Sequence, residues 1–183
     1  MIYTVTFNPA LDYVMKVEKL QFDDINRTYG EELNYGGKGI NVSVILSRLG
    51  VENTALGFQA GFTGEKLEEL LKADGIKTDF IALKNGMTRI NVKIKAQTEL
   101  DINAVGPPIE EDEVERLFEK IKAFQSGDVI VLAGSVPGTL PPDIYEKILS
   151  VTSKSGVESV VDATGDLLLN VLKYLAFLIK PNH

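Results

Sequence analysis

The most constraining feature of the sequence is the repeated alternation of short apolar runs with helical patterns. The run "DVIVLAG" at residues 128–134 is apolar almost throughout, which is typical of a strand buried on both faces of a parallel sheet. Further strands are predicted at 2–7, 54–58, 79–83, 157–161 and 177–179. Helices are predicted at 38–49, 63–73 and 110–124, after Pro141 and Pro142, and after an N-cap at Thr164. This order of elements predicts a doubly wound, mainly parallel α/β sheet.

Two segments break this alternation, at about 14–35 and 88–104. Both show strand-like alternation without a helix between, as in "TRINVKIKA". We expect them to form antiparallel strands that lie off the main sheet as a small lid.

The composition excludes several classes of protein. The formal net charge of −7 argues against a nucleic-acid binder, which needs a basic face to neutralise phosphates. No apolar run is long enough to predict a membrane span, and the first residues lack the pattern of a secretory signal. The absence of cysteine excludes disulfides and thiol catalysis, and it fits a cytoplasmic protein. The 183 residues fit one domain or a little more.

The stretch "NYGGKGINVSVIL" at residues 34–46 resembles a phosphate loop but fits neither standard motif. A Walker A loop is excluded because Gly39 follows Lys38 and because position 32 is a glutamate, and the spacing G-x-G-x-x-G is absent. A glycine turn at a helix N-terminus still favours an anion or an oxygen-rich ligand, to which Lys38 and Asn41 would add a charge and an amide. The alternative is that the glycines only permit the turn. The inward face of this helix is predicted to carry Val42, Ile45, Leu46 and Leu49.

Polar residues follow several predicted strands, at the edge where open α/β sheets bind ligands. Asp12 comes just after the first strand, where its carboxylate either accepts hydrogen bonds from sugar hydroxyls or belongs to a turn after an Asn-Pro pair. Gly134 and Ser135 follow the buried strand, and the ligand and turn interpretations are equally supported there. Asp162 either faces the same edge or only caps the next helix.

Cationic residues in the two predicted lid segments suggest that the lid also contributes to such a ligand site. Arg89, Asn91 and Lys93 alternate along one face of a predicted lid strand, which indicates either anion binding or a protected, solvated edge strand. Arg27 gives a weaker signal of the same kind. With a single histidine at position 183, no Ser-His-Asp triad and no cluster of His or Cys ligands can be assembled.

Seven motifs in this order resemble those of the ribokinase-like (PfkB) carbohydrate kinases over the whole chain. The motifs are "TFNPALDYV", "GGKGINVS", "GFTG", "TRINVKI", "AGSVP", "VVDATGDLLLNVL" and "IKPNH". Within the family the chain is most similar to bacterial 1-phosphofructokinases, and next to tagatose-6-phosphate kinases. The resemblance implies a Rossmann-like α/β domain with a β-lid that often serves dimerisation.

The resemblance also implies phosphoryl transfer from Mg-ATP to a hydroxyl of a sugar phosphate. By motif, the residues that would hold the sugar are Asp12, Gly37, Lys38 and Asn41. The residues that would line the pocket from the lid are Arg27, Arg89, Asn91 and Lys93. One or more of these four would bind the phosphate that the sugar already carries. Ser135 would lie beside them. Asn182 would match the asparagine that helps organise Mg²⁺, directly or through water.

Three departures qualify this resemblance. The segment "KAQTELDINAVGPP" is shorter than the lid hairpin of the family, and Gln59-Ala60 stand where relatives carry a glycine. The family's catalytic base, its anion hole and its nucleotide loops lie beyond residue 183. We therefore expect an N-terminal portion of a kinase domain that is inactive alone, whose complete form converts fructose 1-phosphate to fructose 1,6-bisphosphate. The alternatives are a tagatose-6-phosphate kinase and a non-catalytic module that binds a sugar phosphate. A homodimer through the lid is implied by the family only.

Overall fold

A seven-stranded parallel sheet forms the centre of the molecule, of which the computed structural model describes residues 1–181. Its strands are β1 (Ile2–Thr6), β4 (Asn53–Gln59), β5 (Lys77–Thr78), β6 (Ile81–Ala82), β9 (Val129–Ala133), β10 (Glu158–Asp162) and β11 (Leu178–Ile179). The order is β11-β10-β9-β1-β4-β5, with β6 also paired to β4, and every pairing is parallel. The predicted mainly parallel α/β sheet is thus confirmed.

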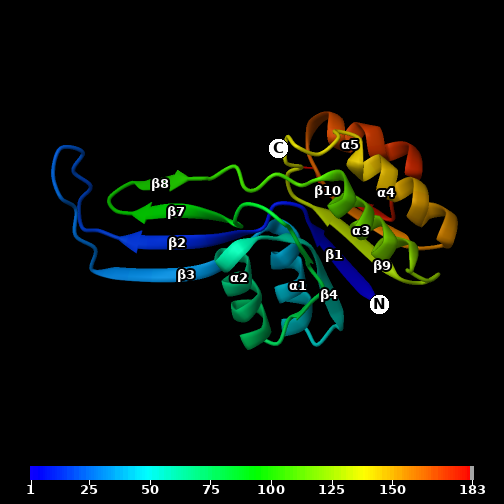
Figure 1. Ribbon diagram of the computed structural model, residues 1–183, viewed down its shortest axis with the longest axis horizontal. Coiled ribbons are helices and arrows are strands. Elements are labelled where there is room, and N and C mark those ends of the chain that lie inside the picture. Colours follow the sequence, from blue (N-terminus) through cyan, green and yellow to red (C-terminus); the bar gives the residue numbers. More distant parts are fainter. Residues whose placement is uncertain (182–183) are drawn as a thin grey trace.

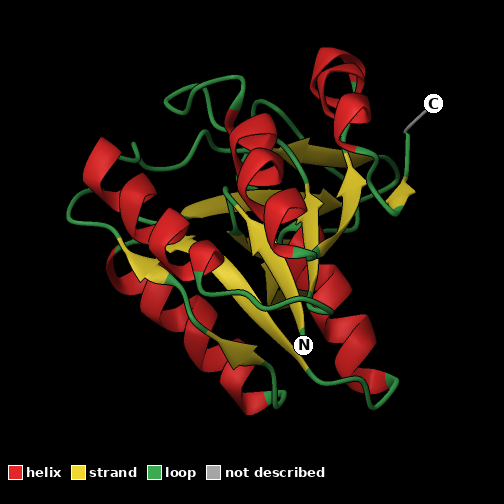
Figure 2. Ribbon diagram, turned by 90° about the vertical axis from the view of Figure 1, so that its right-hand side faces the viewer, coloured by secondary structure: helices red, strands yellow, loops and turns green. Residues whose placement is uncertain are grey.

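Helices cover both faces of this sheet (Figures 1 and 2). They are α1 (Lys38–Arg48), α2 (Gly61–Ala73), α3 (Glu111–Lys122), α4 (Ile144–Thr152) and α5 (Gly165–Val171), with short 3-10 turns η1 (Ser153–Ser155) and η2 (Leu172–Tyr174). Helices α1 and α2 pack in one apolar cluster, and α3, α4 and α5 pack in another on the opposite face. Within residues 1–181, no helix has the length and apolar character needed to cross a membrane.

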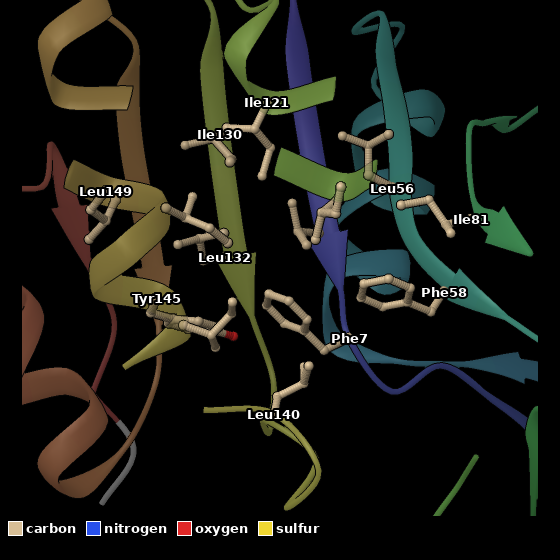
Figure 3. Packing of buried hydrophobic residues seen from close by; sticks show 14 of the residues in the cluster. Phe7, Leu56, Phe58, Ile81, Ile121, Ile130, Leu132, Leu140, Tyr145 and Leu149 are labelled. Carbon is tan, nitrogen blue, oxygen red and sulfur yellow. The ribbon is translucent and has the colours of Figure 1, made fainter. Parts of the chain in front are cut away.

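The larger apolar cluster holds the sheet and helices α3 and α4 together (Figure 3). Phe7 lies at its centre, with ring centroids 6.1 Å from Phe58 and 5.7 Å from Tyr145. Leu132 and Ile130 project from β9 into the same cluster and are fully buried. Burial of such side chains stabilises a fold by about 1.5–3 kcal/mol each, so this cluster fixes the end of the sheet from which the loop after β9 departs.

Helix α1 packs on β1 through small residues, and its predicted inward face is wrong. Its buried residues are Gly39, Ile40, Ser43 and Val44, whereas Ile45 and Leu49 are 54% and 72% exposed. The Ser43 hydroxyl lies 2.7 Å from that of Thr4, and a Cβ added at Gly39 would approach the Val5 carbonyl oxygen to 2.8 Å. The helix lies so close to the strand that only small side chains fit between them.

Two further helices, α4 and α5, begin at the positions that the sequence predicted. Helix α4 begins after Pro141 and Pro142, with Asp143 at the N-cap position. Helix α5 begins directly after Thr164, but the Thr164 side chain makes no capping hydrogen bond.

The lid is a separate four-stranded sheet that extends away from the main sheet (Figure 1). Its strands are β2 (Ala10–Lys16), β3 (Gly30–Gly36), β7 (Arg89–Lys95) and β8 (Glu99–Ile102), in the order β3-β2-β7-β8. The outer pairings, β2 with β3 and β7 with β8, are antiparallel as predicted, but the central pairing of β2 with β7 is parallel. The sheet is mixed because β2 and β7 both leave the main domain in the same direction.

Candidate functional site

A cavity of about 930 Å³ lies where the lid leaves the main sheet. The carboxyl ends of β1, β9 and β10 form its floor, through Thr6, Ala133 and Asp162, and Lys93 of the lid strand β7 lines it as well. The N-terminus of α1 opens into it through Gly37, Lys38 and Asn41. This is the edge of an open α/β sheet at which ligands bind.

The glycine turn before α1 is held against β1. Gly37 is the N-cap residue of α1 with a φ of 132°, which favours glycine, and a Cβ there would lie 2.8 Å from a Thr6 methyl carbon. The Thr6 hydroxyl accepts a hydrogen bond from the Ile40 backbone N–H at 3.0 Å. Thr6 thus takes the place of a capping side chain, and Lys38 and Asn41 occupy the first turn of the helix beside the cavity.

Two lysines face one carboxylate at the cavity wall. Lys38 Nζ lies 3.4 Å from Asp162 Oδ1, and Lys180 Nζ lies 3.2 Å from the same oxygen. Lys38 remains 44% exposed, so its ammonium group is accessible to an anion in the cavity. Of the two alternatives for Asp162, the structure supports the one in which its carboxylate faces the ligand-binding edge of the sheet. The N-cap position of the next helix, α5, is occupied by Thr164.

The lid wall contains a carboxylate held by its neighbours on β7. Asn91 Nδ2 donates to Asp12 Oδ1 at 2.8 Å, and Lys93 Nζ lies 3.5 Å from Asp12 Oδ2 and 3.7 Å from Asp101 Oδ2. Asn91 is 7% exposed, and its Oδ1 is buried and has no hydrogen-bond partner within residues 1–181. Across β3, a Cβ at Gly36 would lie 2.8 Å from Asp12 Oδ1, so glycine there leaves room for the carboxylate.

Arg89 lines the cavity but uses its guanidinium on the backbone. Nη2 donates to the Asn8 carbonyl oxygen at 2.9 Å, and Nη1 donates to the Ala104 carbonyl oxygen at 3.2 Å. Burial lowers the pKa of Arg89 from its usual value, and the nearby charge of Asp12 partly offsets that effect.

The loop after β9 is fixed on both sides of Gly134. The buried Tyr145 hydroxyl donates to the Gly134 carbonyl oxygen at 3.0 Å, and the Gly134 N–H donates to the Asp162 backbone carbonyl oxygen at 3.3 Å. Burial raises the pKa of Tyr145, with a smaller contribution from the Asp162 charge, so the hydroxyl stays a donor over the physiological range. Ser135 follows in the cavity wall.

The structure brings most of the predicted site residues together. Those that line the cavity are Gly37, Lys38, Asn41, Arg89, Lys93 and Ser135. Asp12 is linked to the cavity residue Lys93 by an ion pair, and Asn91 is linked to Asp12 by a hydrogen bond. Arg27 lies in the exposed loop between β2 and β3 and does not line the cavity. Asn182 lies outside the described residues.

Several cavity residues were not predicted as site residues. They are Thr6, Asn8, Asn103, Asp166 and Asn170. Thr6 and Asn8 belong to the same "TFNPALDYV" motif as Asp12, so their position at the carboxyl end of β1 was a usable signal. Asn103 lies in the return from the lid, and only the tertiary fold brings it to the cavity.

Among residues 1–181, no group of three or more His, Cys, Asp or Glu side chains is placed to hold a metal ion. The cavity does contain two carboxylates, Asp162 and Asp166. Mg²⁺ in phosphoryl-transfer sites is typically held by one or two carboxylates together with substrate phosphates and water, so this donor set fits a shared magnesium site better than an all-protein one.

Comparison with known proteins identifies the family. The model of the "pfkB family carbohydrate kinase" matches residues 5–183. The chain is 44% identical over 183 residues to a 1-phosphofructokinase of Bacillus subtilis, and 38% identical over 182 residues to a D-tagatose-1-phosphate kinase of Bacillus licheniformis. Each alignment covers 100% of this chain and 60% of the relative, so the chain spans about three fifths of their length.

A solved structure shares the same fold. The tetrameric inhibited form of phosphofructokinase-2 from Escherichia coli superimposes with a TM-score of 0.89 at 28% identity, over 99% of this chain and 60% of that one. The family match, the parallel sheet with its lid and the cation-lined cavity agree, and the chain belongs to the pfkB family of carbohydrate kinases.

Proposed function

We propose that the complete protein transfers a phosphoryl group from ATP to fructose 1-phosphate and forms fructose 1,6-bisphosphate. The observation that carries this proposal is the cavity itself, which the cations Lys38 and Lys93 line and in which Lys93 Nζ lies 3.5 Å from the carboxylate of Asp12. A sugar phosphate needs both features, cations for its phosphate and a carboxylate for its hydroxyls. The identity to a 1-phosphofructokinase over the whole chain supports the choice of sugar.

In this proposal the described residues hold the acceptor sugar. Asp12 and Asn41 bind its hydroxyls, with Asn91 orienting the Asp12 carboxylate through the 2.8 Å hydrogen bond. Lys38 and Lys93 bind the phosphate already on the sugar, and Ser135 contributes a hydroxyl from the loop after β9. Because little covalent chemistry is required of the protein in phosphoryl transfer, this positioning is its main task.

ATP and Mg²⁺ are the cofactors of the proposed reaction. Mg²⁺ bound with ATP would neutralise charge on the transferred phosphoryl group. Asp162 and Asp166 are the described carboxylates available to it, and Asn182 is the further residue that the family motif suggests. The family resemblance implies that the base and the anion hole lie beyond residue 183, so we expect the 183-residue chain alone to be inactive.

Steady-state kinetics of the complete protein would test the choice of substrate. We expect kcat/KM with ATP to be highest for fructose 1-phosphate, compared with tagatose 1-phosphate, tagatose 6-phosphate and fructose 6-phosphate. The product should carry phosphate on both ends of the sugar by phosphorus NMR. A higher kcat/KM for any of the other three sugars would contradict the proposal.

A tagatose phosphate is the second candidate substrate. The 38% identity to a D-tagatose-1-phosphate kinase favours it, because fructose and tagatose differ only in the configuration of one hydroxyl. The same comparison of kcat/KM values decides between fructose 1-phosphate and tagatose 1-phosphate. A preference for tagatose 6-phosphate would instead support the tagatose-6-phosphate kinase that the sequence left as an alternative.

The 183-residue chain can be tested for binding without catalysis. Titration of the mass-verified chain with fructose 1-phosphate should show binding but no ATP turnover. ATP turnover would contradict the expected inactivity. Absence of heat at millimolar sugar would contradict the idea that the chain serves as a non-catalytic binding module.

We also propose that the lid forms a homodimer through its outer face. One lid face carries the polar site residues, and the other carries Leu11, Tyr13, Leu33, Ile90, Leu100 and Ile102 by strand register. Leu33, Leu100 and Ile102 are 38%, 39% and 54% exposed, which leaves an apolar sheet face open to a second copy. The resemblance to a tetrameric kinase supports self-association of some kind.

Sedimentation velocity would test this homodimer. We expect the parent protein to sediment as a dimer and Leu33→Glu to sediment as a monomer with unchanged far-UV circular dichroism. Leu169→Glu, a matched change at a 63% exposed leucine on α5, is the control and should leave the dimer intact. A dimer that survives Leu33→Glu together with Ile102→Glu would exclude this interface.

A further inference from the structure

The lid sheet arranges polar side chains in rows that run across its strands. Asp12 on β2 is paired with Asn91 on β7, and Lys93 on β7 is paired with Asp101 on β8. Paired residues on neighbouring strands have their side chains on the same face of a sheet. The face that carries Asp12, Asn91 and Lys93 therefore continues onto β8, the last lid strand before the chain returns to α3 (Figure 1).

Asn103 extends the row that contains Asp12 and Asn91. The antiparallel register pairs Val92 with Ile102, so one further step along both chains places Asn103 opposite Asn91. Because side chains alternate between the two faces of a sheet, Asn103 is on the face opposite to that of Ile102. We call Asp12, Asn91 and Asn103 the polar row.

The two ends of the polar row differ in their contacts. Asn91 Nδ2 donates to Asp12 Oδ1 at 2.8 Å, which holds the carboxylate at the β2 end. At the other end, Asn103 lines the cavity, and its side chain makes no hydrogen bond within residues 1–181. Asn103 is also exposed, so its amide can turn toward a ligand in the cavity.

In the middle of the row, Asn91 has an acceptor without a donor. Its Oδ1 is buried and makes no hydrogen bond in the part of the chain that the structure describes. Since Nδ2 of the same amide is directed to Asp12 on β2, Oδ1 lies on the side of the amide away from that strand. A buried acceptor without a donor is unfavourable, so this atom indicates a donor that is supplied when the site is filled.

We propose that Asn103 is a sugar-binding residue of this site. When a sugar phosphate enters the cavity, the Asn103 amide N–H donates to Asn91 Oδ1, and the Asn103 carbonyl oxygen accepts a hydrogen bond from a sugar hydroxyl. An amide suits this position because it donates and accepts at once, whereas a carboxylate only accepts. The sugar is then held between Asp12 and Asn103, at the two ends of one row. This inference rests on the proposed sugar-phosphate site and adds a contact from the β8 side of the lid.

Calorimetric titration of the complete protein tests the sugar contact. We expect Asn103→Ala to raise the Kd for fructose 1-phosphate about tenfold, as for the loss of one hydrogen bond between neutral groups. The Kd for inorganic phosphate should change by less than about twofold, because the lost amide is neutral and contacts only the sugar. Thermal denaturation should give the midpoint of the parent protein, since the Asn103 side chain has no hydrogen bond to lose in the unliganded protein.

Gln97→Ala is the matched control. It removes an amide from the exposed turn between β7 and β8, outside the cavity, so both Kd values should stay those of the parent protein.

Side-chain amide signals in proton–nitrogen correlation spectra test the link between the two asparagines. Each asparagine amide gives one pair of signals, and the pairs of Asn91 and Asn103 are identified by their loss in Asn91→Ala and Asn103→Ala. We expect both pairs to shift when fructose 1-phosphate binds. Inorganic phosphate should leave the Asn103 pair in place.

Two results would overturn the inference. One is an unchanged Kd for fructose 1-phosphate in Asn103→Ala. The other is an equal loss of affinity for inorganic phosphate, which would mean that the variant disturbs the phosphate pocket and not a sugar contact.

The proposed kinase reaction is judged by a separate measurement on the parent protein. Binding of fructose 1-phosphate without its phosphorylation would contradict the kinase reaction alone, and the titrations would still decide the role of Asn103. A parent protein that binds no sugar phosphate would contradict both proposals.

Discussion

The side chain of Asn91 donates to the Asp12 carboxylate at 2.8 Å, which joins the two parallel lid strands directly beside the cavity. The bond leaves Asp12 Oδ2 next to Lys93 and fixes the direction in which the carboxylate faces. A sugar hydroxyl that binds there meets an acceptor already held in place, so less conformational freedom is lost on binding.

The first prediction concerns this pair. In the complete protein, Asp12→Asn should weaken fructose 1-phosphate binding about tenfold or more, since a charged acceptor of a hydroxyl is lost. Asn91→Ala should weaken it less, and the double variant should lose less than the sum of the two because Asn91 acts through Asp12. Calorimetric titration measures all three. Asn34→Ala, opposite Asp12 on β3, is the control, and strictly additive losses would show that the two residues act independently.

A second prediction concerns Lys38. Replacement by methionine should lower the affinity for a sugar phosphate about tenfold, and it should also make binding less sensitive to salt. The fold should be retained because Lys180 still faces Asp162 at 3.2 Å. Lys72→Met on α2, whose exposed ammonium group lies 2.6 Å from Glu68 and away from the cavity, is the control for net charge. An unchanged salt dependence in Lys38→Met would argue that Lys38 does not contact the anion.

Close packing of α1 on β1 gives a third prediction. Gly39→Ala would place a Cβ 2.5 Å from the Thr6 hydroxyl oxygen and 2.8 Å from the Val5 carbonyl oxygen. We expect a loss of about 1–3 kcal/mol in the free energy of unfolding, despite the better helix propensity of alanine. Gly138→Ala, where an added Cβ has no atom within 4 Å, should change stability by less than about 0.5 kcal/mol. Urea denaturation compares the two, and equal stabilities would refute this account of the packing.

A fourth prediction concerns pH. The N-terminal ammonium group, which donates to Asp128 Oδ1 at 2.8 Å, and the Gln125 backbone N–H both favour the charged carboxylate, so the pKa of Asp128 lies below its usual value of 3.8. Because the folded-state pKa is the lower one, the stabilisation is complete above the unfolded-state pKa and is lost as the pH falls through the folded-state value. Asp128→Asn should therefore cost about 0.5–1 kcal/mol at neutral pH, and this difference should vanish in acid.

Thermal denaturation across the pH range, with a free Met1 amine, measures that difference. Asp23→Asn, in the exposed loop of the lid, changes the net charge by the same amount and should show little effect at any pH. A cost for Asp128→Asn that persists at pH 2 would assign the effect to packing.

Local patterns in the sequence were sufficient to predict the main sheet. The run before Gly134 and the helix before Gly50 lie where the structure has β9 and α1, since strand burial and helix termination are set by nearby residues. The inward face of α1 was not predictable in this way. Large aliphatic residues such as Ile45 normally mark the buried face, but here the distance between helix and strand selects Gly39 and Ser43 instead.

The sequence motifs were sufficient to predict which residues gather at the candidate site. They were not sufficient to predict which hydrogen bonds and ion pairs those residues form. Lys38, Lys93 and Ser135, which the motifs singled out, line one cavity. The hydrogen bond from the Arg89 guanidinium to the Asn8 carbonyl oxygen joins segments 81 residues apart, and the bond that the parallel pairing allows between Asn91 and Asp12 joins segments 79 residues apart. No local sequence pattern indicates which cationic side chain donates its hydrogen bonds to backbone carbonyl oxygens and which remains accessible to a ligand.

The parallel pairing of β2 with β7 also determines the order in which the protein can form. Between these strands the chain passes through β3, α1, β4, α2, β5 and β6, so the centre of the lid closes only after that stretch has been synthesised. During translation, β2 and β3 leave the ribosome as a lone hairpin, a pair of strands that is marginal in water by itself. The wall that carries Asp12 thus waits for β7, whose start is held at the N-terminus of α2 through Thr88, and the cavity is complete only once β9 and β10 have added Ala133 and Asp162.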